Sequence, residues 1–110
     1  MSEKIKITYP ETELSREQLY RHTVARGTSL KDVDDGTKIL VKEIVSYEDA
    51  DGQKIISMLD EENKHYVSSS TIFREELAKI VDIFGSTGIT LVIRKIVSKG
   101  GRTYVTCELG

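Results

Sequence analysis

Tyrosine and basic residues within strand-like segments are the side chains of this sequence best suited to chemistry. An aromatic ring offers a face on which a nucleobase can stack, and lysine or arginine offers positive charge to a phosphate. A groove that combined the two would hold a single strand of nucleic acid with little regard for its sequence. The candidate residues for such a groove are Lys42, Tyr47, Lys54, Tyr66, Arg94, Lys99, Arg102 and Tyr104.

The strand pattern around each tyrosine predicts where its ring points. Tyr104 alternates with Val105, and the face that carries Val105 is the more apolar one, so Tyr104 is expected on the outer or groove face. Tyr66 is expected to be exposed if its neighbour Val67 points into the core, because adjacent strand residues point to opposite faces. Tyr47 ends its strand beside an acidic turn, where base stacking and packing at the rim of the sheet are equal alternatives.

The basic candidates gather mainly near one predicted hairpin. Lys99 and Arg102 flank a Gly-Gly pair, which favours a tight turn because glycine adopts positive φ without strain. Arg94 lies in the strand before this turn, and Lys42 and Lys54, in two earlier strands, would extend the same positive track. The ordinary alternative is that these charges only keep a surface soluble.

Catalytic and metal-binding signatures are missing from the sequence. Its two histidines, His22 and His65, and its single cysteine, Cys107, do not have the spacing of a zinc site. Cys107 alternates with polar residues in a strand and is expected to be a small buried hydrophobe. Neither a phosphate loop nor a nucleophile motif occurs. We therefore expect a protein that is not an enzyme and uses no cofactor or metal.

The composition favours one soluble domain. The chain has 110 residues, of which 38% are hydrophobic and 31% charged, and it contains no apolar run of the roughly 18 residues that a membrane span needs. The lone cysteine and the polar N-terminus predict a cytoplasmic location. The net charge of −2 argues against simple nucleic-acid binding, but residues 83–110 contain four basic residues and one acidic residue.

The elements that position these candidates follow residue 34. Three strand-like runs come first, then an amphipathic helix, then a two-strand hairpin. This β-β-β-α-β-β order is mainly β with one helix, and it is typical of a small five-stranded oligonucleotide-binding (OB) barrel. A slip in the alternation between Val41 and Ile44 predicts a β-bulge that bends a long first strand. The predicted strands are residues 37–47, 54–59, 64–68, 89–97 and 103–109.

The predicted helix is capped by one of residues 69–71 and ended by Gly85. We expect it to plug the bottom of the barrel. Its apolar stripe at helical spacing is expected in the core and consists of Phe73, Leu77, Ile80, Val81 and Phe84.

Residues 1–33 are predicted to form an N-terminal extension to the barrel of residues 34–110. A short strand from Ile5 to Tyr9 is stopped by Pro10, and a helix from Thr12 or Ser15 is broken by Gly27. We expect this extension either to lie on the barrel or to serve self-association.

Two segments resemble a known family. The run Ser29-Leu30-Lys31-Asp32-Val33-Asp34-Asp35-Gly36-Thr37, and the Ser98-Lys99-Gly100-Gly101 hairpin with the strand after it, are similar to segments of the single-stranded DNA-binding proteins of protein-primed bacteriophages. The resemblance covers roughly residues 29–110, whereas residues 1–28 do not follow the family pattern. It implies an OB fold that coats displaced single strands during phage DNA replication.

The working hypothesis is a cytoplasmic protein, not an enzyme, that coats single-stranded DNA. RNA is a further possible ligand, because stacking platforms do not separate the two. Further partners would be replication proteins or a second copy of the chain; a membrane is not expected. The rival hypothesis is a protein–protein interaction module on the same barrel. It gains if Tyr47, Tyr66 and Tyr104 face the core or scatter over the surface.

Overall fold

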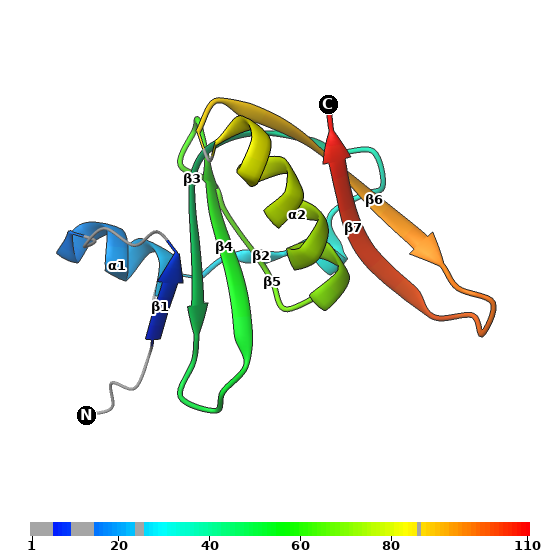
Figure 1. Ribbon diagram of the computed structural model, residues 1–110, viewed down its shortest axis with the longest axis horizontal. Coiled ribbons are helices and arrows are strands. Elements are labelled where there is room, and N and C mark those ends of the chain that lie inside the picture. Colours follow the sequence, from blue (N-terminus) through cyan, green and yellow to red (C-terminus); the bar gives the residue numbers. More distant parts are fainter. Residues whose placement is uncertain (1–5, 10–14, 24–25, 86) are drawn as a thin grey trace.

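The protein is built on one curled sheet that forms a half-barrel around a helix (Figure 1). The computed structural model describes residues 6–9, 15–23, 26–85 and 87–110. Within them seven strands form the sheet, and the expectation of a mainly β fold is confirmed. Along the sheet the strands are β2 (Thr28–Ser29), β5 (His65–Ser68), β4 (Lys54–Asp60), β3 (Lys38–Glu48), β6 (Ile89–Val97) and β7 (Thr103–Leu109), with β1 (Lys6–Tyr9) paired to β3.

The sheet has seven strands instead of the five predicted for the barrel: each of the five predicted segments forms a strand, and two further strands join them. Strand β1 matches the predicted N-terminal strand, of which Ile5 and Pro10 lie outside the described residues. Strand β2 has two residues, is parallel to β5 and was not predicted. The 3₁₀ turn η1 (Leu30–Asp32) follows β2 and contacts both β7, one end strand of the sheet, and β5, the neighbour of the other end strand, β2.

Strand β3 is the long bent strand that the sequence predicts. Its first residues, Lys38 to Val41, pair with β6, and its residues from Val41 onward pair with β4. The register slips between Val41 and Glu43, which confirms the predicted bulge. Past the bulge, the edge of β3 that faced β6 turns to β1 instead. One strand therefore serves both halves of the sheet.

Helix α2 (Thr71–Phe84) lies in the hollow of the half-barrel (Figure 1). The Ser70 hydroxyl caps it by accepting a hydrogen bond from the Phe73 amide at 3.2 Å, and Gly85 ends it with a φ of +86°. The same hydroxyl donates to the Val105 carbonyl of β7 at 3.1 Å. This serine therefore joins the start of the helix to the last strand of the sheet.

Burial decreases along the predicted apolar stripe of α2. Phe73 and Leu77 are buried, and Ile80 and Val81 are partly buried against the core. Phe84 is 52% exposed, so its predicted place in the core is wrong. Phe84 is the last residue of the helix, and only the earlier turns of the helix lie over the core.

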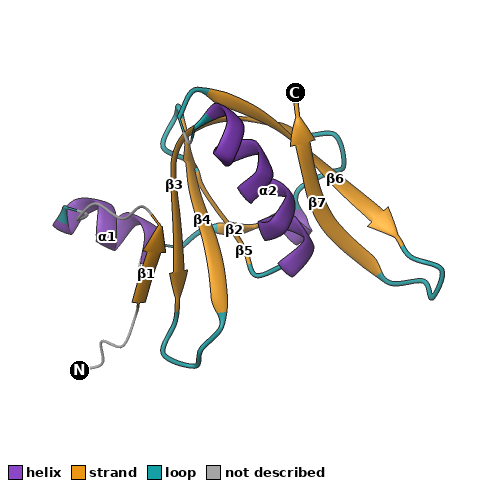
Figure 2. Cartoon of the chain, in the orientation of Figure 1, coloured by secondary structure: helices purple, strands orange, loops and turns teal. Residues whose placement is uncertain are grey.

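The N-terminal part of the chain contributes one described helix, which lies against the other side of the sheet (Figure 2). Helix α1 (Arg16–Thr23) confirms the predicted helix and contacts β4, so α1 and α2 lie on opposite sides of the β3–β4 layer (Figure 2). Leu30 and Val33 are buried in the core, although the sequence assigned residues 1–33 to an extension. Among the described helices, neither α1 nor α2 is long and apolar enough to cross a membrane.

Phe73 and Phe84 provide a test of this packing, because they share a helix and a chemistry but differ in burial. We expect Phe73→Ala to lower the free energy of unfolding by about 3–5 kcal/mol, since it removes a buried ring and leaves a cavity. Phe84→Ala should lower it by less than about 1 kcal/mol. Urea denaturation followed by circular dichroism measures both, and equal losses would contradict this orientation of α2.

Candidate nucleic-acid interface

The β6–β7 hairpin extends away from the body of the molecule (Figure 1). Its turn is closed by the Ser98 amide, which donates to the Arg102 carbonyl at 2.8 Å, and by the Gly101 amide, which donates to the Ser98 carbonyl at 3.0 Å. Gly101 has a φ of +84°, a backbone conformation that glycine adopts without strain. Lys99 and Arg102, the two predicted cations that flank this turn, are both exposed to solvent.

Tyr104 lies on the outer face of this hairpin and is partly exposed, as the alternation predicts. It is opposite Ile96, which is 41% exposed, and Arg94 lies on the same face two residues earlier. Val97, on the other face, is 66% exposed. An aromatic ring, two aliphatic side chains and three cations thus gather on one hairpin. We call this set the hairpin surface; it comprises Arg94, Ile96, Val97, Lys99, Arg102 and Tyr104.

Arg94 is held by two carboxylates. Its guanidinium donates to Glu108 Oε1 at 3.2 Å and lies 3.8 Å from Asp35. Because all three side chains are about half exposed, solvent screens these pairs and they add little to stability. They do reduce the positive charge that Arg94 offers to a ligand, which leaves Lys99 and Arg102 as the stronger anion contacts.

The two basic candidates on the earlier strands lie apart from the hairpin surface. The Lys42 ammonium donates to Asn63 Oδ1 at 2.6 Å, next to the β4–β5 turn. Lys54 is exposed but lies opposite Glu48 in the β3–β4 ladder, beside the acidic tip that contains Asp49. The predicted track of positive charge is therefore not continuous.

Two of the three candidate tyrosines are buried. Tyr66 is 8% exposed and lies opposite Met58 in the core, so its expected exposure is wrong. Its neighbour Val67 points outward instead and is partly buried. The inward and outward positions of this strand are therefore the reverse of those predicted. Tyr47 is 6% exposed between Ile7 of β1 and its partner on β4. The three rings do not converge on one groove.

The environment of Tyr47 also affects its phenol. Burial raises the pKa of Tyr47, and the nearby Asp49 carboxylate raises it further. The burial of Tyr47 agrees with packing at the rim of the sheet, which was one of its two predicted roles, and not with base stacking, which was the other.

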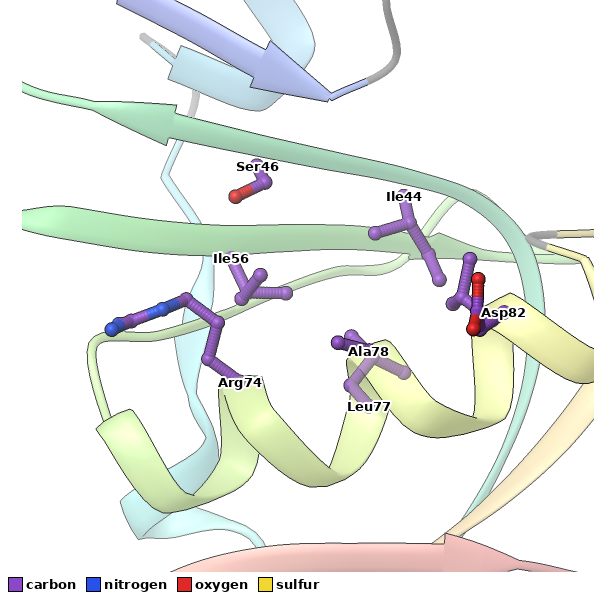
Figure 3. Close-up of a pocket in the computed structure, with 8 residues that line it drawn as sticks. Ile44, Ser46, Ile56, Arg74, Leu77, Ala78 and Asp82 are labelled. Carbon is purple, nitrogen blue, oxygen red and sulfur yellow. The ribbon is translucent and has the colours of Figure 1, made fainter.

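An apolar groove of about 470 Å³ lies between α2 and the inner face of β3 and β4 (Figure 3). Ile44, Ile56 and Leu77 are its most buried residues, and Arg74 and Asp82 lie on the helix side of its rim. The groove exists because α2 packs mainly against β7 and leaves space on its β3–β4 side. It offers an apolar floor with one charge of each sign.

A buried polar network that the sequence did not predict lies on the opposite side of the β3–β4 layer. His22 of α1 is 1% exposed and its Nε2 is 2.6 Å from Glu43 Oε1 of β3. Its Nδ1 is 2.7 Å from Ser57 Oγ of β4, which is in turn 2.6 Å from His65 Nε2 of β5. The residues come from four elements, so no local spacing in the sequence could reveal them. The sequence shows only a histidine within a short polar helix, and its burial is visible only in the structure.

This network resembles a catalytic triad in composition but not in access. Ser57 is fully buried, so its hydroxyl cannot reach a substrate. Within the described residues, no group of three or more His, Cys, Asp or Glu side chains could hold a metal ion. The network therefore has the geometry of a structural element that joins α1 to the sheet.

No known protein family, curated protein or solved structure matches this chain. What the chain binds must therefore be inferred from its own surfaces.

Glu43 makes the acid stability of the protein testable. Burial acts to raise the pKa of this carboxyl group, but hydrogen bonds from His22 and Gln18 outweigh it and the pKa is lowered. Its stabilising contribution is thus present above the ordinary glutamate pKa and lost as pH falls through the lower folded-state value. Glu43→Gln should flatten the fall in unfolding free energy below about pH 4.5. Urea titrations at several pH values measure this, with Glu17→Gln as the control.

Cys107 is buried, as predicted, and should be unreactive. Burial, followed by the Glu76 and Glu108 carboxylates, raises the pKa of its thiol to about 12. The thiolate fraction near pH 8 should therefore be about a thousandfold below that of a free cysteine. We expect a thiol-specific chromogenic reagent to react with the folded protein far more slowly than with the protein in urea, and equal rates would contradict this.

Proposed function

We propose that this chain is a non-enzymatic protein that binds single-stranded DNA and coats exposed strands, as during replication, with little sequence preference. One observation carries the proposal: a projecting hairpin on which Lys99 and Arg102 are exposed beside a partly exposed Tyr104. The hairpin has no acidic residue from Arg94 to Cys107. It combines the two contacts that single-strand binding requires.

The chemistry of each contact favours a single strand over a duplex. Lys99 and Arg102 pair with successive phosphates, and the ring of Tyr104 stacks on an unpaired base, with Ile96 beside it. A stacked base contributes about 1–3 kcal/mol, and a duplex withholds its base faces from such contact. Phosphate contacts and stacking on a ring face carry no sequence information, which agrees with binding that ignores sequence.

The charges on the two hairpin tips favour the approach of a nucleic acid to the β6–β7 hairpin. The β3–β4 tip carries Glu48, Asp49 and Asp51, whereas the β6–β7 tip carries Lys99 and Arg102. A polyanion is repelled by the first tip and attracted by the second, even though the net charge of the chain is −2.

A protein–protein interaction module is the second candidate function. It is favoured by the burial of Tyr47 and Tyr66, which removes two of the three expected stacking platforms. The apolar groove beside α2 would be the binding surface in that case.

Titration of a fluorescent oligothymidine with the protein tests the first proposal, with a duplex and an oligouridine of equal length as comparisons. We expect tighter binding to the single-stranded DNA and a logarithmic salt dependence of about −0.7 per phosphate neutralised. Lys99→Glu with Arg102→Glu should remove most of the affinity, whereas Lys64→Glu, a reversal at an exposed turn, should have little effect. No binding at low salt would favour the interaction module, and preference for the RNA would contradict DNA as the ligand.

Tyr104→Ala tests stacking separately from charge. It should weaken binding by about 5- to 150-fold, which corresponds to one stacked base, and leave the salt dependence unchanged. Tyr20→Ala is the matched control, because Tyr20 is also exposed but lies on α1. Equal affinities of the two variants would exclude Tyr104 as a stacking platform.

A further inference from the structure

Arg94 turns one edge of its guanidinium toward the carboxylate of Glu108. The Nε and Nη2 groups of Arg94 both donate to Glu108 Oε1, each at 3.2 Å. Two adjacent donors of this kind are what an arginine uses to bind a phosphate through two parallel hydrogen bonds. The carboxylate of Glu108 therefore occupies a position that suits a phosphate of a ligand.

The two acids beside Arg94 differ in how firmly they are held. Asp35 Oδ1 accepts a hydrogen bond from the Lys95 amide at 2.7 Å, while Asp35 Oδ2 lies 3.8 Å from Arg94 Nη1. The side chain of Glu108 is 56% exposed, and among the described residues Arg94 is the one hydrogen-bond partner of its carboxylate. Glu108 can thus turn into solvent at the cost of one exposed ion pair, whereas Asp35 stays anchored to the backbone.

Arg94 lies on the opposite side of Tyr104 from the tip of the hairpin. Ile96 is opposite Tyr104 in the β6–β7 ladder, and Arg94 is opposite Thr106. Two such successive positions on one face of a strand are about 6.8 Å apart. The ring of Tyr104 therefore has the cations of the tip on one side and Arg94 on the other. A nucleotide stacked on this ring extends one neighbouring phosphate toward the tip and the other toward Arg94.

We propose that Arg94 is an anion subsite of the hairpin surface, filled by Glu108 in the free protein and by a phosphate of the bound strand. This inference rests on the proposed binding of single-stranded DNA and adds a competitor that is part of the chain itself. The strand displaces Glu108 when it binds, so the pair that breaks offsets part of the attraction to Arg94.

The competitor also favours a long ligand over a small anion. A free phosphate ion that binds Arg94 must displace Glu108 and gains no other contact. A strand that displaces Glu108 also stacks on Tyr104 and pairs with Lys99 and Arg102 at the tip. Glu108 therefore raises the selectivity of the hairpin surface for a polynucleotide, because it lowers the affinity for every ligand but only a strand compensates for the loss.

Titration of a fluorescent oligothymidine with Glu108→Gln tests this competition. We expect the variant to bind about 1.5- to 5-fold more tightly than the wild type, which is the effect of one exposed ion pair expressed as an affinity ratio. Glu17→Gln is the matched control, because it removes the same charge from a similar exposed pair, with Arg21 at 3.0 Å. That pair lies on α1, at the other end of the molecule from the hairpin (Figure 1), so the affinity should not change.

Arg94→Gln tests whether a phosphate reaches the guanidinium. The logarithmic salt dependence should become shallower by about 0.7, because one phosphate contact is lost. In the double variant with Glu108→Gln, the gain in affinity from Glu108→Gln should disappear, since Glu108 acts through Arg94.

The outcomes separate this subsite from the binding proposal. If the wild type binds at low salt but Glu108→Gln binds no more tightly, or if the gain persists without Arg94, the subsite is overturned and the binding proposal stands. An equal gain in Glu17→Gln would also overturn the subsite, because net charge alone would then explain the effect. If the wild type does not bind the oligothymidine at low salt, the binding proposal fails and the subsite fails with it.

Discussion

Strand β3 has more pairing partners than any other described strand, and the arrangement of the rest depends on how it bends. Its first half pairs with β6 and its second half with β4 and β1, which is possible because the register slips between Val41 and Glu43. A straight strand would keep β6 and β4 in one flat layer, whereas the bulge turns the sheet into a half-barrel. The hollow so formed receives α2, the outer face of the second half receives α1, and its free edge pairs with β1 (Figure 2).

Much of this fold follows from local patterns in the sequence. The bulge, the cap at Ser70, the end of α2 at Gly85 and the limits of β6 and β7 are all encoded by neighbouring residues. The face that a tyrosine occupies is not, because alternation gives two opposite sets without saying which is inside. Tyr66 belongs to the core because Met58, across the ladder, does; that pairing is a long-range fact.

The candidate site divides in the same way. Lys99, Arg102 and Tyr104 share one hairpin, so their proximity is predictable from turn chemistry and strand alternation. The positions of Lys42, Lys54 and Tyr47 relative to this hairpin depend on how separate strands are arranged. The structure places all three away from the hairpin surface. The histidine network is the extreme case, because its members meet only when α1 docks across three strands. Its four elements are joined by side-chain hydrogen bonds, so it couples the N-terminal segment to the sheet where apolar packing is sparse.

The double role of the Ser70 hydroxyl has a consequence for the solubility of the protein. Strand β7 is the last in the sheet, and an end strand offers its backbone groups as a template for pairing with another molecule. The hydrogen bond from Ser70 occupies the Val105 carbonyl at the middle of that strand, and α2 stands beside it. The serine that caps the helix thus also covers part of the free edge of β7, which makes pairing of this strand with another molecule less favourable.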